Sequence, residues 1–208
     1  MATIIKRVTL APIVMLVTCA CLLLLSGCAR YARNVNTFYE PSANVRGGSG
    51  DVYIVIPENR QSRSSGIKWV LGQVKDDDNN TIDEVFSPRS PAEIIQAAFG
   101  TEFKRAGYTV IPATKRPVAG QMVIDLTKTE IDLEQVSDLL DLKTKCRVLV
   151  GVEVFKNGQQ IKRFQYESTS SKTDIQDRDM LARNVLEESL QSVMLKAMPE
   201  LHDLFINR

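Results

Sequence analysis

The chain has 208 residues and carries 26 lysines and arginines against 25 aspartates and glutamates, which gives a formal net charge of +1. This balance excludes the extended basic surface that binds nucleic acid and the basic arm that binds anionic lipid. The length is sufficient for one domain whose hydrophobic core needs no disulfide.

The N-terminal segment has the pattern of a secretory signal. Lys6 and Arg7 precede an uncharged, mainly apolar run over residues 8–25, and small residues follow it. A basic region, an apolar region and small residues before a cleavage site are the three parts of such a signal. A transmembrane anchor is the weaker alternative: about 18 apolar residues can just span a bilayer, but nothing anchors the far end.

Residues 25–28 read Leu-Ser-Gly-Cys and resemble the lipobox of bacterial lipoproteins. The resemblance implies that a signal peptide over residues 1–27 is removed by cleavage between Gly27 and Cys28. It further implies that Cys28 carries a covalent lipid and anchors the protein to a membrane. We expect no other cofactor and no metal.

One cysteine is left without a partner inside the chain. Cys19 and Cys21 leave with the signal and Cys28 takes the lipid, so Cys146 stands alone. Alternating apolar residues place Cys146 on the inward face of a strand, which predicts a buried small hydrophobe. Intermolecular pairing or a reactive thiol is the alternative.

Residues 28–50 lack apolar periodicity and end in Arg-Gly-Gly-Ser-Gly, which predicts a flexible tether between the lipid and the domain. A coil of this length reaches about 25 Å. Tyr31, Phe38 and Tyr39 are candidates either for the membrane interface or for docking on the domain.

A single α+β domain is expected over residues 51–208. Apolar runs at 52–56, 67–74 and 81–86 predict three strands, and Asp76-Asp77-Asp78-Asn79-Asn80 predicts the turn between the last two.

This acidic turn is the one candidate metal site. Asp76, Asp78 and Asn80 have the alternate spacing of a calcium loop, but Thr81 and Ser87 replace its glycine and its glutamate. A hairpin turn is therefore the better interpretation.

Ser90-Pro91-Ala92-Glu93 has the pattern of a capping box with proline in the first helical turn. Ile95, Phe99 and Phe103 follow on one face, and Gly107 is placed to end the helix. A strand over residues 108–111 is expected to stop at Pro112.

The second half of the domain has the pattern of a β-meander. Alternation at Ile124 and Leu126 changes parity before Ile131 and Leu133, which predicts a bulge near residues 127–129. In the next hairpin, pairing of apolar residues favours a three-residue loop over residues 156–158 rather than a two-residue Asn157-Gly158 turn.

The C-terminal segment predicts a helix from Asp177 with a break at Pro199. Its apolar stripe consists of Ala182, Leu186, Leu190, Val193, Ala197 and Leu201. Two helices with one apolar stripe each and strands with one apolar face predict an antiparallel or mixed sheet. Both helices would pack on one face, as a two-layer sandwich.

The order of these elements resembles the YajG-type lipoproteins of Gram-negative bacteria. The resemblance rests on the lipobox, on Arg105-Ala106-Gly107-Tyr108-Thr109-Val110 and on the closing Leu201-His202-Asp203-Leu204-Phe205. It implies a periplasmic domain, and Ala29 after the lipidated cysteine implies export to the outer membrane, on its periplasmic face. The family implies no activity.

The residues do not favour an enzyme. His202 is the sole histidine of the sequence and lies in a C-terminal turn, no glycine-rich phosphate loop follows a strand, and no histidine–cysteine cluster has metal spacing.

We therefore expect a non-catalytic interaction or accessory subunit with an envelope protein partner, which contacts it through a sheet edge or through Arg60 and Arg63. The alternative is a periplasmic binding module for a lipid, glycan or peptide, with an apolar lining around Phe99, Phe103, Phe164 and Tyr166.

Overall fold

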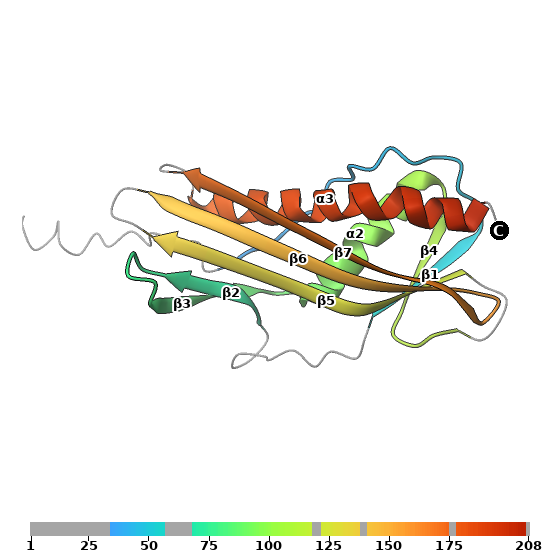
Figure 1. Cartoon of the computed structure of the whole chain (residues 1–208), viewed down its shortest axis with the longest axis horizontal. Helices are drawn as coiled ribbons and strands as arrows, with labels where there is room; N and C mark the ends of the chain where they lie inside the picture. Colours follow the sequence, from blue (N-terminus) through green and yellow to red (C-terminus); the bar gives the residue numbers. More distant parts are fainter. Residues whose placement is uncertain (1–33, 57–67, 118–121, 138–140, 175–177, 207–208) are drawn as a thin grey trace, which may run out of the picture. The chain divides into compact units, whose positions relative to one another are not determined.

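The computed structural model describes residues 34–56, 68–117, 122–137, 141–174 and 178–206 (Figure 1). These residues form an α+β fold with a seven-stranded mixed sheet and two helices. The elements are β1 (Asp51–Val55), β2 (Trp69–Lys75), β3 (Thr81–Ser87), α2 (Pro91–Ala106), β4 (Thr109–Ala113), β5 (Met122–Ser137), β6 (Leu142–Lys156), β7 (Gln159–Asp174) and α3 (Arg178–Ile206). Neither of these helices combines the length and the apolarity that a membrane span needs.

Strand β5 organises the sheet. One edge of β5 pairs with β6 along nearly its whole length, and β6 pairs in turn with β7. The other edge pairs in parallel with β1 over residues 122–125 and with β2 over residues 133–136. Strand β4 extends the sheet beyond β1, and β3 extends it beyond β2.

The bulge predicted in β5 is confirmed. The pairing of β5 with β6 shifts between Leu126 and Lys128, so the inward parity changes between Leu126 and Ile131. Gly151 lies opposite the bulge, where an added Cβ would come within 2.9 Å of the Thr127 Oγ1 atom. The bulge increases the local twist of the long strands.

The three-residue loop predicted between β6 and β7 is wrong. Lys156 pairs with Gln159 across a two-residue turn in which Asn157 and Gly158 have φ angles of 53° and 78°. A bulge then shifts the register between Val154 and Phe155. This second irregularity returns Phe164 and Tyr166 to the apolar face, which the turn alone would not achieve.

Helix α2 begins and ends as predicted. Ser90 accepts the backbone N–H of Glu93, the Glu93 carboxylate accepts the N–H of Ser90, and Pro91 is the first helical residue. Gly107 ends the helix with a φ angle of 110°. The apolar stripe predicted for α2 is fully buried.

Helix α3 does not break at Pro199, and this prediction is wrong. The helix continues for 29 residues to Ile206 with Pro199 inside it. The predicted apolar stripe is fully buried on both sides of the proline. We infer that this continuous burial outweighs the hydrogen bond that proline cannot donate.

The strand expected to stop at Pro112 instead runs to Ala113. Thr109 donates its N–H to Gly50 and Ala113 accepts the N–H of Ile56, so these residues face β1. Pro112 therefore points its nitrogen away from β1, where no ladder bond is lost.

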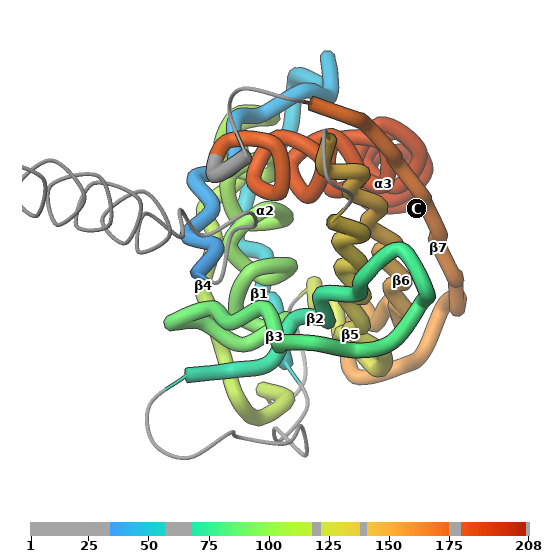
Figure 2. The backbone as a smooth tube through the Cα atoms, turned by 90° about the vertical axis from the view of Figure 1, so that its left-hand side faces the viewer, coloured from blue at the N-terminus to red at the C-terminus, as the bar shows by residue number. Residues whose placement is uncertain are grey.

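The sheet curls around the helices, as Figure 2 shows. Helix α3 packs along β6 and β7, whereas α2 packs against β1, β4 and β5. One continuous core contains residues of both helices and of the sheet. The predicted two-layer sandwich with both helices on one face is not confirmed, because the long, twisted strands curl the sheet.

Candidate functional site

The residues predicted for cleavage, lipid attachment and partner contact lie outside the described residues. These are Gly27, Cys28, Arg60 and Arg63. The candidate site is therefore built from two features of the described chain: the segment that follows the predicted anchor, and an open edge of the sheet.

Residues 34–50, here called the strap, run across the domain rather than away from it. Val35, Ala43 and Val45 are buried in the main core. The backbone N–H of Gly48 donates to the Ala106 carbonyl at the end of α2. The prediction of a flexible tether is therefore wrong for residues 34–50, because apolar contacts and hydrogen bonds fix them; residues 28–33 lie outside the described residues.

A buried carboxylate of α2 holds the strap. The Glu102 side chain is 1% exposed, and its Oε1 atom accepts the N–H groups of Ser42 at 2.7 Å and Ala43 at 3.1 Å. The Tyr39 hydroxyl donates to the same oxygen. These donors replace the water that the carboxylate loses on burial.

Sequence reasoning missed Glu102 as a functional residue. Its spacing three residues after Phe99 places it on the apolar side of α2, next to Phe103. A charged residue at such a position is the signal that predicts a buried, hydrogen-bonded carboxylate.

Helix α3 contributes a second set of strap contacts. The Glu40 N–H donates to Glu187 Oε1 at 3.0 Å, and Gln191 Nε2 donates to the Glu40 carbonyl at 3.1 Å. Arg105 Nη1 of α2 donates to the Pro41 carbonyl at 2.5 Å. The strap thereby links the two helices to each other.

The structure decides between the two roles left open for the aromatic residues of this segment. Tyr39 docks on the domain, where burial and the neighbouring Glu102 raise the pKa of its hydroxyl. Phe38 is 66% exposed, with the Arg183 guanidinium 5.5 Å from its ring centroid. Tyr31 lies outside the described residues.

The sole histidine of the sequence is part of a ring cluster. His202 is 9% exposed, and its Nδ1 atom lies 2.9 Å from the Tyr108 hydroxyl. The Tyr108 ring also contacts Phe103 and Phe205 edge-on. The two short motifs that carried the family resemblance, residues 105–110 and 201–205, thus meet in the core. There they connect the start of β4 with the end of α3.

The four aromatic residues proposed to line an interior site belong to two ring pairs on different elements. Phe99 and Phe103 stack on each other in α2 and are fully buried. Phe164 and Tyr166 stack on each other in β7, and the Tyr166 hydroxyl donates to Glu200 Oε2 at 3.0 Å. Both pairs pack in or against the core.

The acidic turn between β2 and β3 is a hairpin turn, as predicted. Asp76 Oδ1 accepts the Asn80 N–H at 2.7 Å, and Asp76 Oδ2 accepts the Asn80 amide at 3.2 Å. Within the described part of the chain, no group of three metal-binding side chains occurs.

The prediction that Cys146 is buried is confirmed. Its side chain is 0% exposed in β6 and is a free thiol. Burial raises its pKa to about 12, so the thiol stays protonated and unreactive at neutral pH.

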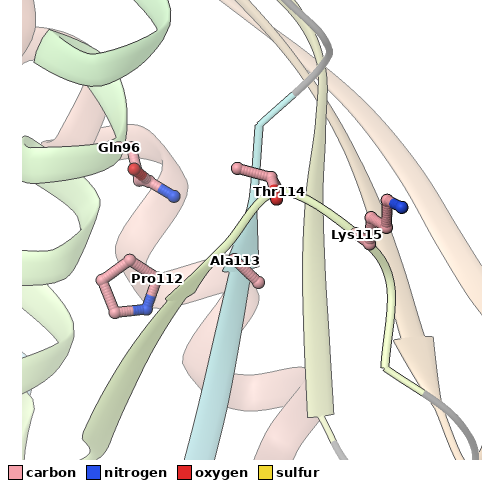
Figure 3. A pocket seen from close by; sticks show the side chains of 5 residues that line it. All are labelled: Gln96, Pro112, Ala113, Thr114 and Lys115. Atoms are coloured by element: carbon pink, nitrogen blue, oxygen red, sulfur yellow. The ribbon is translucent and has the colours of Figure 1, made fainter.

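Between α2 and β4 lie two adjoining cavities, here called the edge groove. Figure 3 shows the residues that line the larger of the two. Their volumes are about 290 and 450 Å³, and Gln96 and Pro112 line both. The Gln96 side chain reaches from α2 towards the strands and donates to the Ile54 carbonyl of β1 at 2.7 Å. The other lining residues are Glu93, Ala97, Gly100, Thr101, Lys104, Val110, Ala113, Thr114 and Lys115.

No family model matches this chain, and no curated protein matches it, so membership of the YajG-type family stays a prediction. The fold is similar to that of a DUF330 protein from Xanthomonas campestris, with 10% identity over 84% of this chain and 94% of that one and a TM-score of 0.49. It is also similar to a putative neuraminyllactose-binding hemagglutinin homolog from Helicobacter pylori (14% identity, 83% and 91% coverage, TM-score 0.40). A minor lipoprotein from Acinetobacter baumannii is 11% identical over 76% of this chain and 92% of that one, with a TM-score of 0.31. At these identities and scores the likeness does not extend to function.

Proposed function

We propose that this protein is a lipid-anchored envelope lipoprotein that acts as a non-catalytic interaction or accessory subunit, held by Cys28 on the periplasmic face of the outer membrane. Its partners are the membrane, through the lipid, and an envelope protein. The observation that carries the proposal is the docked strap, combined with the Leu-Ser-Gly-Cys motif at residues 25–28.

The strap limits how far the domain can stand from its anchor. Only residues 29–33 separate Cys28 from Asn34, the first residue of the strap. Six residue steps of at most about 3.6 Å span roughly 20 Å even when fully extended. A domain held this close meets a membrane-bound partner at a high effective concentration, so weak contacts suffice.

The described residues also favour a non-catalytic role. The sole histidine is engaged with Tyr108 inside a ring cluster and is 9% exposed. A histidine-based nucleophile would need that nitrogen at a substrate-accessible surface.

A periplasmic binding module for a lipid, glycan or peptide is the second candidate. The edge groove favours it, because the cavity volumes come close to or fall within the usual range of about 300–1,000 Å³ for a ligand site. The packed aromatic pairs of the core give no such support.

Two variants test the proposed function. Cys28→Ala is expected to remove the lipid mass and to take the protein out of the outer-membrane fraction. Insertion of ten Gly/Ser residues between Arg33 and Asn34 keeps the lipid and the fold but raises the fully extended reach from roughly 20 Å to roughly 58 Å. We expect it to weaken in-envelope crosslinking to the partner.

Reversal of Arg60 and Arg63 to glutamate tests the loop contact in the same assay. Recovery of the wild-type protein in inner-membrane fractions would contradict the localisation. Crosslinking to no protein at all, with a glycan or lipid co-purifying, would favour the second candidate.

A further inference from the structure

We infer that the edge groove is a docking site for an extended segment of a partner protein, which adds a strand to the free edge of β4 and carries acidic side chains. The inference rests on the proposed interaction function and specifies the surface and the kind of partner.

Strands β3, β4 and β7 form the outer edges of the sheet among the described residues, and the edge of β4 lies beside the edge groove. The strap bonds to the edge of β3 at one position, where the Val35 N–H donates to the Phe86 carbonyl at 2.8 Å. On β7, Lys196 Nζ of α3 donates to the Glu167 carbonyl at 3.1 Å. Both edges are thus partly occupied from within the domain.

The β4 edge offers backbone groups in a regular row. Because Thr109 and Ala113 direct their bonds to β1, the alternate residues Val110 and Pro112 point theirs outward. Among the described residues, none bonds to the N–H and carbonyl of Val110 or to the carbonyl of Pro112. An extended peptide presents the matching donors and acceptor at the same spacing.

The wall of α2 leaves room for the side chains of such a strand. Ala97 and Gly100 are small, and a Cβ added at Gly100 would reach the Val110 side chain at an ordinary contact distance of 3.6 Å. None of the lining residues is aromatic, which disfavours a glycan. Few are large and apolar, which disfavours a lipid chain.

The charges of the groove point to acidic side chains on the partner. Glu93 is engaged at the start of α2, where its carboxylate accepts from Ser90. Lys104 and Lys115 are exposed and form no ion pair with another described residue. Two unengaged ammonium groups beside the edge attract carboxylates.

The first test is photocrosslinking of the full lipoprotein in the envelope. The photoreactive residue replaces Ala97 or Thr114 in the groove, and Leu195 on α3 or Ile82 on β3 as controls. We expect one defined protein adduct from the groove positions only, lost in a Lys104→Glu/Lys115→Glu variant and kept in Lys145→Glu. A defined adduct from the control positions only would overturn the inference and leave the proposed function standing. Adducts from no position would overturn both.

The second test uses a fluorescent ten-residue peptide of alternating valine and glutamate with the purified lipoprotein in detergent. We expect binding to slow hydrogen exchange at the Val110 N–H. N-methylation of alternate peptide bonds removes about two hydrogen bonds and should weaken binding at least about tenfold.

Ala97→Trp fills the groove and should weaken binding to a similar extent, whereas Leu195→Trp on the exposed face of α3 should leave it unchanged. Equal binding of the methylated peptide, equal binding by Ala97→Trp, or no slowing of exchange at Val110 would overturn the inference.

Discussion

The strap and the β6–α3 region are held in place by different physical means. Over residues 142–156 and 178–206 the core residues alternate or repeat every three to four positions, and large apolar side chains pack on one another. The strap has no such period, and much of its order comes from hydrogen bonds that converge on Glu102 and from short contacts with α3. The packing of the β6–α3 region is distributed over many residues. The position of the strap depends largely on a few hydrogen-bond acceptors.

The largest expected loss of stability is in the β6–α3 region. Leu186→Ala removes a fully buried side chain of α3. We expect a loss of about 2–5 kcal/mol in the free energy of unfolding, since the cavity adds to the lost transfer energy. Urea denaturation measures it. The control Leu195→Ala, at a position 54% exposed, should stay within about 0.5 kcal/mol of wild type. Equal losses would contradict the assigned packing of α3.

Removal of a single acceptor, the Glu102 carboxylate, should loosen the strap. Glu102→Ala leaves the N–H groups of Ser42 and Ala43 without their carboxylate. We expect a loss of about 2–3 kcal/mol, or release of the strap with fast hydrogen exchange at both amides.

The matched control is Glu187→Ala, which removes one exposed strap contact and should lose no more than about 1 kcal/mol. Unchanged amide protection in Glu102→Ala would show that apolar contacts alone hold the strap.

The buried thiol of Cys146 in β6 makes the free energy of unfolding depend on pH. Burial raises the pKa of Cys146 from 9.0 to about 12, so the folded state keeps a proton that the unfolded state releases. The contribution of the protonated thiol to the free energy of unfolding is fully present below pH 9 and is lost as the pH rises towards 12.

At pH 11 the loss amounts to about 3 kcal/mol in wild type. Cys146→Ala should therefore show a shallower fall of stability between pH 9 and 11 in urea titrations. Parallel curves for the two proteins would contradict the buried, protonated thiol.

The smallest effect concerns the proline inside α3. Pro199 is exposed and cannot donate a helical hydrogen bond. Pro199→Ala should raise the free energy of unfolding by about 1 kcal/mol, less than the intrinsic difference of about 3 because the surrounding helix has adapted. A lower thermal midpoint would show instead that the proline fits a bend that the fold needs.

The sequence predicted the elements with a strong local signal. The capping box at Ser90, the bulge near residues 127–129 and the inward Cys146 follow from patterns that the chain repeats or that a few neighbouring residues complete. The errors at Pro199 and in the β6–β7 turn arise where a local rule competes with packing across elements. In both places the burial of an apolar face prevailed.

The candidate site was less predictable than the fold. The edge groove depends on which strand ends the sheet, and that follows from pairing between β1 and β4, which lie more than fifty residues apart. Local sequence patterns do not predict which distant strands pair with each other.

By itself, the sequence determined the motif for lipid attachment, the α+β class and the faces of the strands and helices, because these depend on residue type and period. Only the tertiary structure decided that residues 34–50 are docked rather than free, that Glu102 holds them, and that β4 presents an open edge beside α2. The physical reason is that a buried polar group is stable only when distant parts of the chain supply its partners.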